Sequence, residues 1–240
     1  APDAPWLLWL GLGACHAPHQ APQALIRPYD DVFAAGWDVE REQRLARQKQ
    51  LGLVPPDTTL PPRNDGVPAW DTLGEDQRRV FTRLQSAYAG MLEHADQHIG
   101  RLLGFLDQAG LADDTLVLVL SDNGASQEGG PLGFVNAMGP YNLKPEDLAE
   151  KLRRIDDIGG PDTHSNFPQG WAMASNTPLK RYKQNTHGGG IRDPLVMAWP
   201  RQGRSSSRWR ASSQPSWSSA STVAANRALL LPSLIFRASA

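Results

Sequence analysis

The spacing of apolar side chains predicts one long helix near the middle of the chain. Between residues 73 and 109 apolar positions recur every three or four residues, which is the spacing of one face of an α-helix. These positions are Phe81, Leu84, Tyr88, Met91, Ala95, Ile99, Leu102 and Leu106. The preceding Thr72-Leu-Gly-Glu75 is a capping-box pattern, and Gly110 provides an end signal. We interpret the stripe as a core contact and not as a cofactor groove.

Three short apolar runs predict strands. They are Trp6–Ala14, Thr115–Leu120 and Leu195–Trp199. The first two are nearly continuous apolar runs, which is typical of strands buried on both faces.

Two further helices and a loop complete the pattern. A heavily charged helix over Trp37–Leu51 should lie on the surface, and a short helix should span Pro145–Ile158. Leu53–Ala69 contains five prolines and should be a loop. The order helix, strand, polar loop is typical of α/β proteins, so we expect a mixed, mostly parallel sheet flanked by helices.

Composition narrows the class of protein. The 240 residues have a formal net charge of −1 and a mean hydropathy of −0.44. This charge gives no electrostatic reason to expect a nucleic-acid partner. No apolar run approaches the roughly 18 residues of a transmembrane helix. The single Cys15 rules out an internal disulfide, and the sequence indicates no compartment.

The C-terminal 40 residues differ from the rest. Residues 201–240 contain eleven Ser and six Arg but no Asp or Glu. We therefore divide the chain into a domain over 1–200 and a disordered or out-of-frame tail over 201–240. Our hypothesis is a shift of reading frame shortly after Pro200. Because the chain begins Ala-Pro-Asp without a Met, we also expect it to be a fragment.

The most informative segment runs from Leu116 to Gly124. An apolar run ends abruptly in Ser121-Asp122-Asn123-Gly124, so a strand should deliver a carboxylate and a carboxamide to its C-terminal end. Carboxylate and amide oxygens suit Ca²⁺ or Mg²⁺. The same residues also fit an Asx/Gly turn without a metal, and the segment alone favours the turn.

Two other segments change that balance. His16 lies in His-Ala-Pro-His-Gln-Ala-Pro, and Lys183 begins Lys-Gln-Asn-Thr-His-Gly-Gly-Gly-Ile-Arg-Asp-Pro. With Ser121-Asp122-Asn123-Gly124 between them, this order resembles the sulfatases, the arylsulfatase branch of the alkaline-phosphatase superfamily. The resemblance covers about residues 5–200 and implies a partial alkaline-phosphatase-like α/β fold.

The resemblance also implies roles. Asp122 and Asn123 look like two ligands of one divalent cation, usually Ca²⁺. Lys183 resembles the lysine that contacts a sulfate oxygen, and His16 resembles the histidine near the ester oxygen. We expect Arg192 to anchor its loop and not to contact the substrate. These residue types suit the chemistry, since negative charge develops on the bridging oxygen when the S–O bond breaks.

The chain also departs from the sulfatase pattern. Sulfatases carry a Cys or Ser, converted to formylglycine, within Cys/Ser-x-Pro-Ser/Ala-x-Arg, and this sequence has no such motif. We reject Cys15 as the nucleophile because its proline falls one place late, and we expect a small buried residue there. The family's paired N-terminal aspartates are also missing, and Gly188 replaces a Glu or Gln.

The resulting prediction is a metal-dependent hydrolase of small sulfate esters that is inactive as this chain. The alternatives are a phosphomonoesterase or phosphonate monoester hydrolase of the same superfamily, or a non-catalytic remnant. His94 and His98 lie one helical turn apart, but without a Glu or third ligand they give little support to a zinc site. His19, His164 and His187 receive no role.

Overall fold

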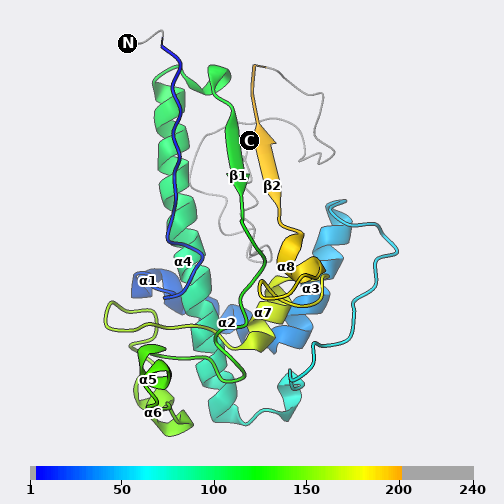
Figure 1. The fold of residues 1–240 in the computed structure, drawn as a ribbon, viewed down its shortest axis with the longest axis vertical. Coiled ribbons are helices and arrows are strands. Elements are labelled where there is room, and N and C mark those ends of the chain that lie inside the picture. The colour runs from blue at the N-terminus through cyan, green and yellow to red at the C-terminus, as the bar shows by residue number, and fades with distance from the viewer. Residues whose placement is uncertain (1–3, 202–240) are drawn as a thin grey trace.

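The computed structural model describes residues 4–201. The long helix α4 (Glu75–Gln108) forms its axis, with strands β1 (Val117–Leu120) and β2 (Leu195–Ala198) beside the C-terminal half (Figure 1). Smaller helices surround the other half: α1 (Gln23–Ile26), α2 (Asp30–Phe33), α3 (Gly36–Gln50), α5 (Met138–Tyr141), α6 (Leu148–Arg153), α7 (Gln169–Ser175) and α8 (Gly188–Ile191). Short 3₁₀ turns are Arg27–Tyr29, Trp70–Thr72 and Ala112–Asp114.

Helix α4 confirms the predicted apolar stripe. Phe81, Leu84 and Tyr88 on this stripe are at most 3% exposed. The predicted capping box at Thr72 and Glu75 is wrong. Gly74 precedes the helix, and its N–H donates to Oε1 of Gln77 at 3.1 Å, whereas the Thr72 hydroxyl donates back to the Ala69 carbonyl.

Aromatic side chains fill the main core. The rings of Trp37, on α3, and Trp171, on α7, lie 5.8 Å apart, and Trp70 packs edge-on against both. The indole N–H groups of two of these residues find acceptors: Trp171 donates to the Phe81 carbonyl at 2.9 Å, and Trp37 to the Pro68 carbonyl at 3.1 Å. Predicted helix Trp37–Leu51 is therefore confirmed, but one face of it is buried.

Strands β1 and β2 confirm two predicted strands but pair antiparallel. Their register places Val117 opposite Ala198 and Leu120 opposite Leu195. This is the one sheet that residues 4–201 form, so the expected mostly parallel sheet is not seen in this part of the chain.

The structure confirms a strand within Thr115–Leu120, but the prediction that both of its faces are buried is wrong. One face packs on α4, where Val117 contacts the cluster of Ile99, Leu103 and Leu106. The other face is open: Leu118 and Met197 are 52% and 50% exposed. A continuous apolar run predicts cover on both faces, but the described residues supply cover for one.

The prediction of a buried strand over Trp6–Ala14 is also wrong. Residues 5–12 form no helix or strand and pair with no strand within the described range, and Leu7 and Trp9 are 93% and 85% exposed. An apolar run becomes a buried strand only where a partner strand satisfies its backbone and another layer covers its side chains.

The remaining predictions concern the helix after Pro145 and the tail. The predicted helix over Pro145–Ile158 is shorter and is confined to α6, where Asp147 caps the first turn by accepting from Glu150 N–H at 2.7 Å. The tail predicted over 201–240 lies outside the described residues except for Arg201. Among the helices of residues 4–201, none combines the length and apolarity needed to cross a bilayer.

Candidate active site

Close backbone packing brings the Ser121–Gly124 loop against the Lys180–Ile191 segment. The Gly124 N–H donates to the Gly190 carbonyl, and a Cβ on Gly124 would lie 1.7 Å from the carbonyl oxygen of Gly189. A Cβ on Gly190 would lie 2.1 Å from the Asn185 carbonyl oxygen. A side chain at Gly124 would therefore push the two loops apart, and one at Gly190 would disrupt the fold of the Lys180–Ile191 segment itself.

Asn176 joins the loops and was missed by the sequence reasoning. This buried side chain accepts from the Ala125 N–H at 2.9 Å and donates to the carbonyls of Arg181 and Gly189, each at 2.9 Å. Three segments thus share one amide. An isolated Asn in a Ser-Asn-Thr-Pro stretch gives no sequence signal for this role.

Lys183 extends from the joined loops to meet His16. Its backbone N–H donates to the Ala125 carbonyl at 3.1 Å, which fixes the root of the side chain. Its Nζ lies 3.2 Å from Nε2 of His16, although the two residues are 167 positions apart. The structure therefore brings together two of the four predicted site residues in direct contact.

The contacts of His16 indicate the role of each ring nitrogen. Its Nδ1 lies 2.8 Å from the Ala17 carbonyl oxygen, which can only accept, so Nδ1 carries a hydrogen. The other nitrogen, Nε2, then presents a lone pair to the Lys183 ammonium. In this arrangement Nδ1 faces the Ala17 carbonyl as a donor, and Nε2 faces the Lys183 ammonium as an acceptor.

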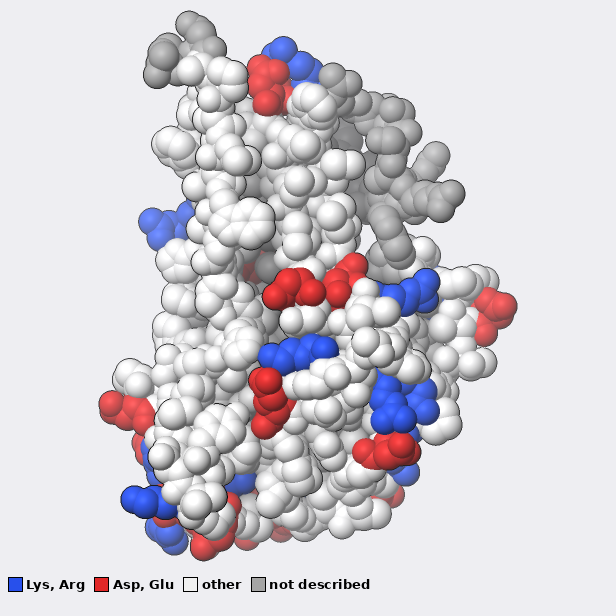
Figure 2. Space-filling view, in the orientation of Figure 1, with Lys and Arg blue, Asp and Glu red and all other residues white. Residues whose placement is uncertain are grey.

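A third side chain, Glu128, completes the cluster and was not predicted. Its Oε2 lies 3.2 Å from Nζ of Lys183, and the lysine side chain is 16% exposed. Burial raises the pKa of Glu128, but hydrogen bonds from Lys183 and Ser126 and the nearby positive charge outweigh it, so the pKa is lowered. Oppositely charged side chains adjoin in the middle of the face in Figure 2, below the sheet.

Asp122 and Asn123 lie in the Ser121–Gly124 loop, but within the described part of the chain they form no hydrogen bond or ion pair with His16 or Lys183. The Asn123 amide donates to the Gly124 carbonyl at 3.0 Å. Burial raises the pKa of Asp193, and the nearby Asp122 carboxylate raises it further, so two acidic groups face one region.

This arrangement offers donors of the right kind for a hard cation. Carboxylate oxygens and a carboxamide oxygen suit Ca²⁺, which takes six to eight oxygen ligands. In residues 4–201 no three His, Cys, Asp or Glu side chains gather as a metal site would require. Asp122 and Asn123 therefore fit as part of a ligand set and not as a whole one.

Cys15 and His19 are structural groups by their surroundings. Burial raises the pKa of the Cys15 thiol to about 11, with a smaller opposing effect from its hydrogen bond to Tyr88, and the residue is partly buried against the core. Burial, with the charges of His16 and His164, lowers the pKa of His19 to about 3. A thiol and an imidazole held neutral here serve packing and not nucleophilic chemistry.

His94 and His98 lie on the exposed side of α4. Their Nε2 atoms are 3.1 Å apart, and Nδ1 of His98 contacts the Arg101 guanidinium at 3.0 Å. The side-chain contacts of the two histidines are thus with each other and with Arg101 on the same helix.

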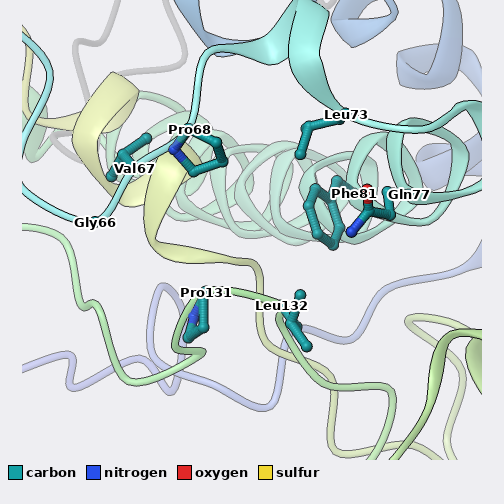
Figure 3. A pocket seen from close by; sticks show the side chains of 8 residues that line it. All are labelled: Gly66, Val67, Pro68, Leu73, Gln77, Phe81, Pro131 and Leu132. Carbon is teal, nitrogen blue, oxygen red and sulfur yellow. The ribbon is translucent and has the colours of Figure 1, made fainter.

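A separate hollow lies between α4 and two loops, with a volume of about 480 Å³ (Figure 3). It is lined by Gly66, Val67, Pro68, Leu73, Gln77, Phe81, Pro131 and Leu132. None of these side chains can exchange a proton near neutral pH, and none is a predicted site residue. The chemistry-bearing groups are those around Lys183.

Known proteins match most of the chain. The Sulfatase family profile matches residues 1–224. An uncharacterized sulfatase of Schizosaccharomyces pombe is 32% identical over 80% of this chain and 34% of its own length. The arylsulfatase of Klebsiella aerogenes is 30% identical over 82% of this chain and 41% of its own length. The steryl-sulfatase of Mus musculus is 31% identical over 50% of this chain and 14% of its own.

The chain thus spans between a third and about two fifths of the length of the first two relatives. The match extends over both loops of the cluster and over the long helix, and the family implies an alkaline-phosphatase-like α/β fold. On this similarity, the chain belongs to the sulfatase family.

Proposed function

We propose that this chain supplies part of the active site of a metal-dependent hydrolase of small sulfate esters. The observation that carries the proposal is the 3.2 Å contact between Lys183 Nζ and His16 Nε2. An ammonium and an imidazole that meet from distant segments place a cationic donor and a proton-transfer group where a sulfate oxygen and its ester oxygen could lie.

Each side chain then has a part in the reaction. The Lys183 ammonium would bind a sulfate oxygen through an N–H that is not used by His16 or Glu128. Nε2 of His16, which accepts from Lys183 in the free site, would take up a proton from solvent and give it to the leaving alkoxide or phenoxide, since Nδ1 is committed to the Ala17 carbonyl. The Asn176 amide would keep both loops in place.

Asp122 and Asn123 would hold a divalent cation, for which Ca²⁺ is our first expectation. A bound cation would neutralise negative charge on the sulfate group. The acidic pair of Asp122 and Asp193 supports this, because burial and the Asp122 charge together raise the pKa of Asp193, and a cation would offset the repulsion between the two carboxylates. Further ligands would have to come from other residues.

We also propose that the chain does not turn over sulfate esters by itself. It has no Cys/Ser-x-Pro-Ser/Ala-x-Arg motif, and the Cys15 thiol is held protonated. In a longer sulfatase, β1 and β2 would join a mostly parallel sheet, whose other strands and helices would cover the open face with Leu118 and Met197.

Calorimetric titration tests the binding part of this proposal. Methyl sulfate added to the 240-residue chain should bind with a measurable dissociation constant, and Lys183→Met should weaken binding at least tenfold. Lys180→Met is the matched control, since it removes the same charge from the same loop and should change affinity less than threefold. Equal weakening by both variants would show nonspecific attraction and would contradict the proposal.

A further inference from the structure

Glu128 shares the Lys183 ammonium with His16 in a way that leaves one donor free. A lysine ammonium has three N–H donors. One points to Oε2 of Glu128 at 3.2 Å and one to Nε2 of His16 at 3.2 Å. The third is available to an anion. A carboxylate therefore stands beside the very group that would bind the substrate.

The loop that carries Glu128 is held firmly. The Glu128 N–H donates to the Ser126 hydroxyl oxygen at 3.0 Å, and the Gln184 amide donates to the same oxygen at 3.2 Å. The next residue, Gly129, passes so close to the Phe167 carbonyl that a Cβ would lie 1.9 Å from its oxygen. The backbone that carries Glu128 is thus fixed, and the ion pair with Lys183 holds the carboxylate beside the ammonium.

A fixed negative charge at this place acts differently on two classes of ester. A sulfate monoester carries one negative charge, whereas a phosphate monoester carries close to two above its second pKa of about 6. Repulsion from Glu128 is proportional to the ligand's charge, so it weighs about twice as heavily on the phosphate ester.

We propose that Glu128 is a specificity-determining residue that makes the Lys183–His16 pair favour singly charged sulfate esters over doubly charged phosphate esters. This inference rests on the proposed function, because it concerns the anion bound at the same lysine. At about 6 Å and an effective dielectric constant of about 40–80, one carboxylate weakens binding roughly three- to tenfold for each charge on the ligand.

The test compares methyl sulfate with methyl phosphate at pH 8, without divalent cations, in calorimetric titrations of the 240-residue chain. Glu128→Gln should tighten methyl sulfate binding roughly three- to tenfold and methyl phosphate binding roughly ten- to a hundredfold. The preference for sulfate over phosphate should therefore fall roughly three- to tenfold.

Glu150→Gln is the matched control. Glu150 pairs with Arg153 on α6 and contacts neither His16 nor Lys183, so this variant changes the net charge equally and should leave the preference unchanged. Circular dichroism checks the fold of each variant, and Glu128→Met repeats the removal of charge with a different side chain.

Two failures can be told apart. If the unsubstituted chain binds neither anion, or binds both equally well after Lys183→Met, the proposed anion site is wrong and Glu128 loses its role with it. If methyl sulfate binds through Lys183 but Glu128→Gln changes the two affinities by the same factor, the anion site stands and the specificity role of Glu128 is overturned.

Discussion

The side-chain amide of Asn176 donates to the carbonyl oxygen of Gly189 at 2.9 Å, while its own oxygen accepts from the backbone N–H of Ala125 at 2.9 Å. One buried side chain thereby joins the loop that follows β1 to the loop that precedes β2. The position of Lys183 depends on this connection, because its backbone N–H donates to Ala125.

Replacement of Asn176 should therefore be costly. Asn176→Ala leaves three backbone groups without their partner, and we expect it to lower the free energy of unfolding by about 2–4 kcal/mol in urea titrations. It should also abolish methyl sulfate binding. Asn142→Ala removes one exposed hydrogen bond and should cost less than about 1 kcal/mol. Equal losses for the two variants would contradict the joining role.

The buried His19 should make the fold sensitive to acid. Its pKa is lowered by burial from 6.5 to about 3, so below pH 6.5 the unfolded chain binds a proton that the folded chain does not. Stability should fall as the pH drops from about 6.5 towards 3, by about 1.5 kcal/mol between pH 6.5 and 5. Urea unfolding of wild type and His19→Phe at both pH values measures this.

His19→Phe should lose that contribution while the rest of the pH dependence remains. The neighbours of the ring are Tyr88 and Phe167, so an aromatic replacement keeps the character of the site. The same change in stability for both proteins between pH 6.5 and 5 would show that His19 is not the group responsible.

Cys15 should react slowly with thiol reagents while the chain is folded. Raising the thiol pKa from 9 to about 11 reduces the thiolate fraction at pH 8 about a hundredfold. The rate of reaction with Ellman's reagent should differ by at least this factor between native buffer and concentrated urea. A native rate similar to the unfolded one would mean an available thiolate and would reopen Cys15 as a nucleophile.

The open face of the two-stranded sheet should promote self-association. Leu118 and Met197 lie opposite each other in the register and are both half exposed. Replacing them with Glu and Lys should change the free energy of unfolding by less than about 1 kcal/mol and reduce the apparent size on gel filtration. Val117→Glu, on the face against α4, should instead destabilise the fold strongly. Similar effects of both changes would contradict the assignment of the two faces.

How far the sequence predicts this structure depends on the range of the interactions. Helix α4 follows from local periodicity, and β1 and β2 follow from their apolar runs. Their burial and pairing do not, because these depend on which other layers cover them. The start of α4 at Gly74 was missed because Thr72 and Glu75 offered an equally good local pattern.

The same distinction applies to the site. The motifs around His16, Asp122 and Lys183 carried the family resemblance, and the structure brings their segments together. Glu128 and Asn176 could not be found in this way, since each gains its role from contacts that form only on folding. Glu128 meets Lys183, and Asn176 meets Ala125 and Gly189. Whether Asp122 and Asn123 hold a cation stays a prediction.

The central claim is that His16 and Lys183 form one anion-binding centre. The most direct measurement is an NMR titration of the 240-residue chain with methyl sulfate, followed on the His16 Hε1 and the Lys183 side-chain Hε signals. We predict a nuclear Overhauser effect between these protons before titration and shifts of both signals with one common dissociation constant. No Overhauser contact, or shifts that follow different curves or persist in Lys183→Met, would contradict the account.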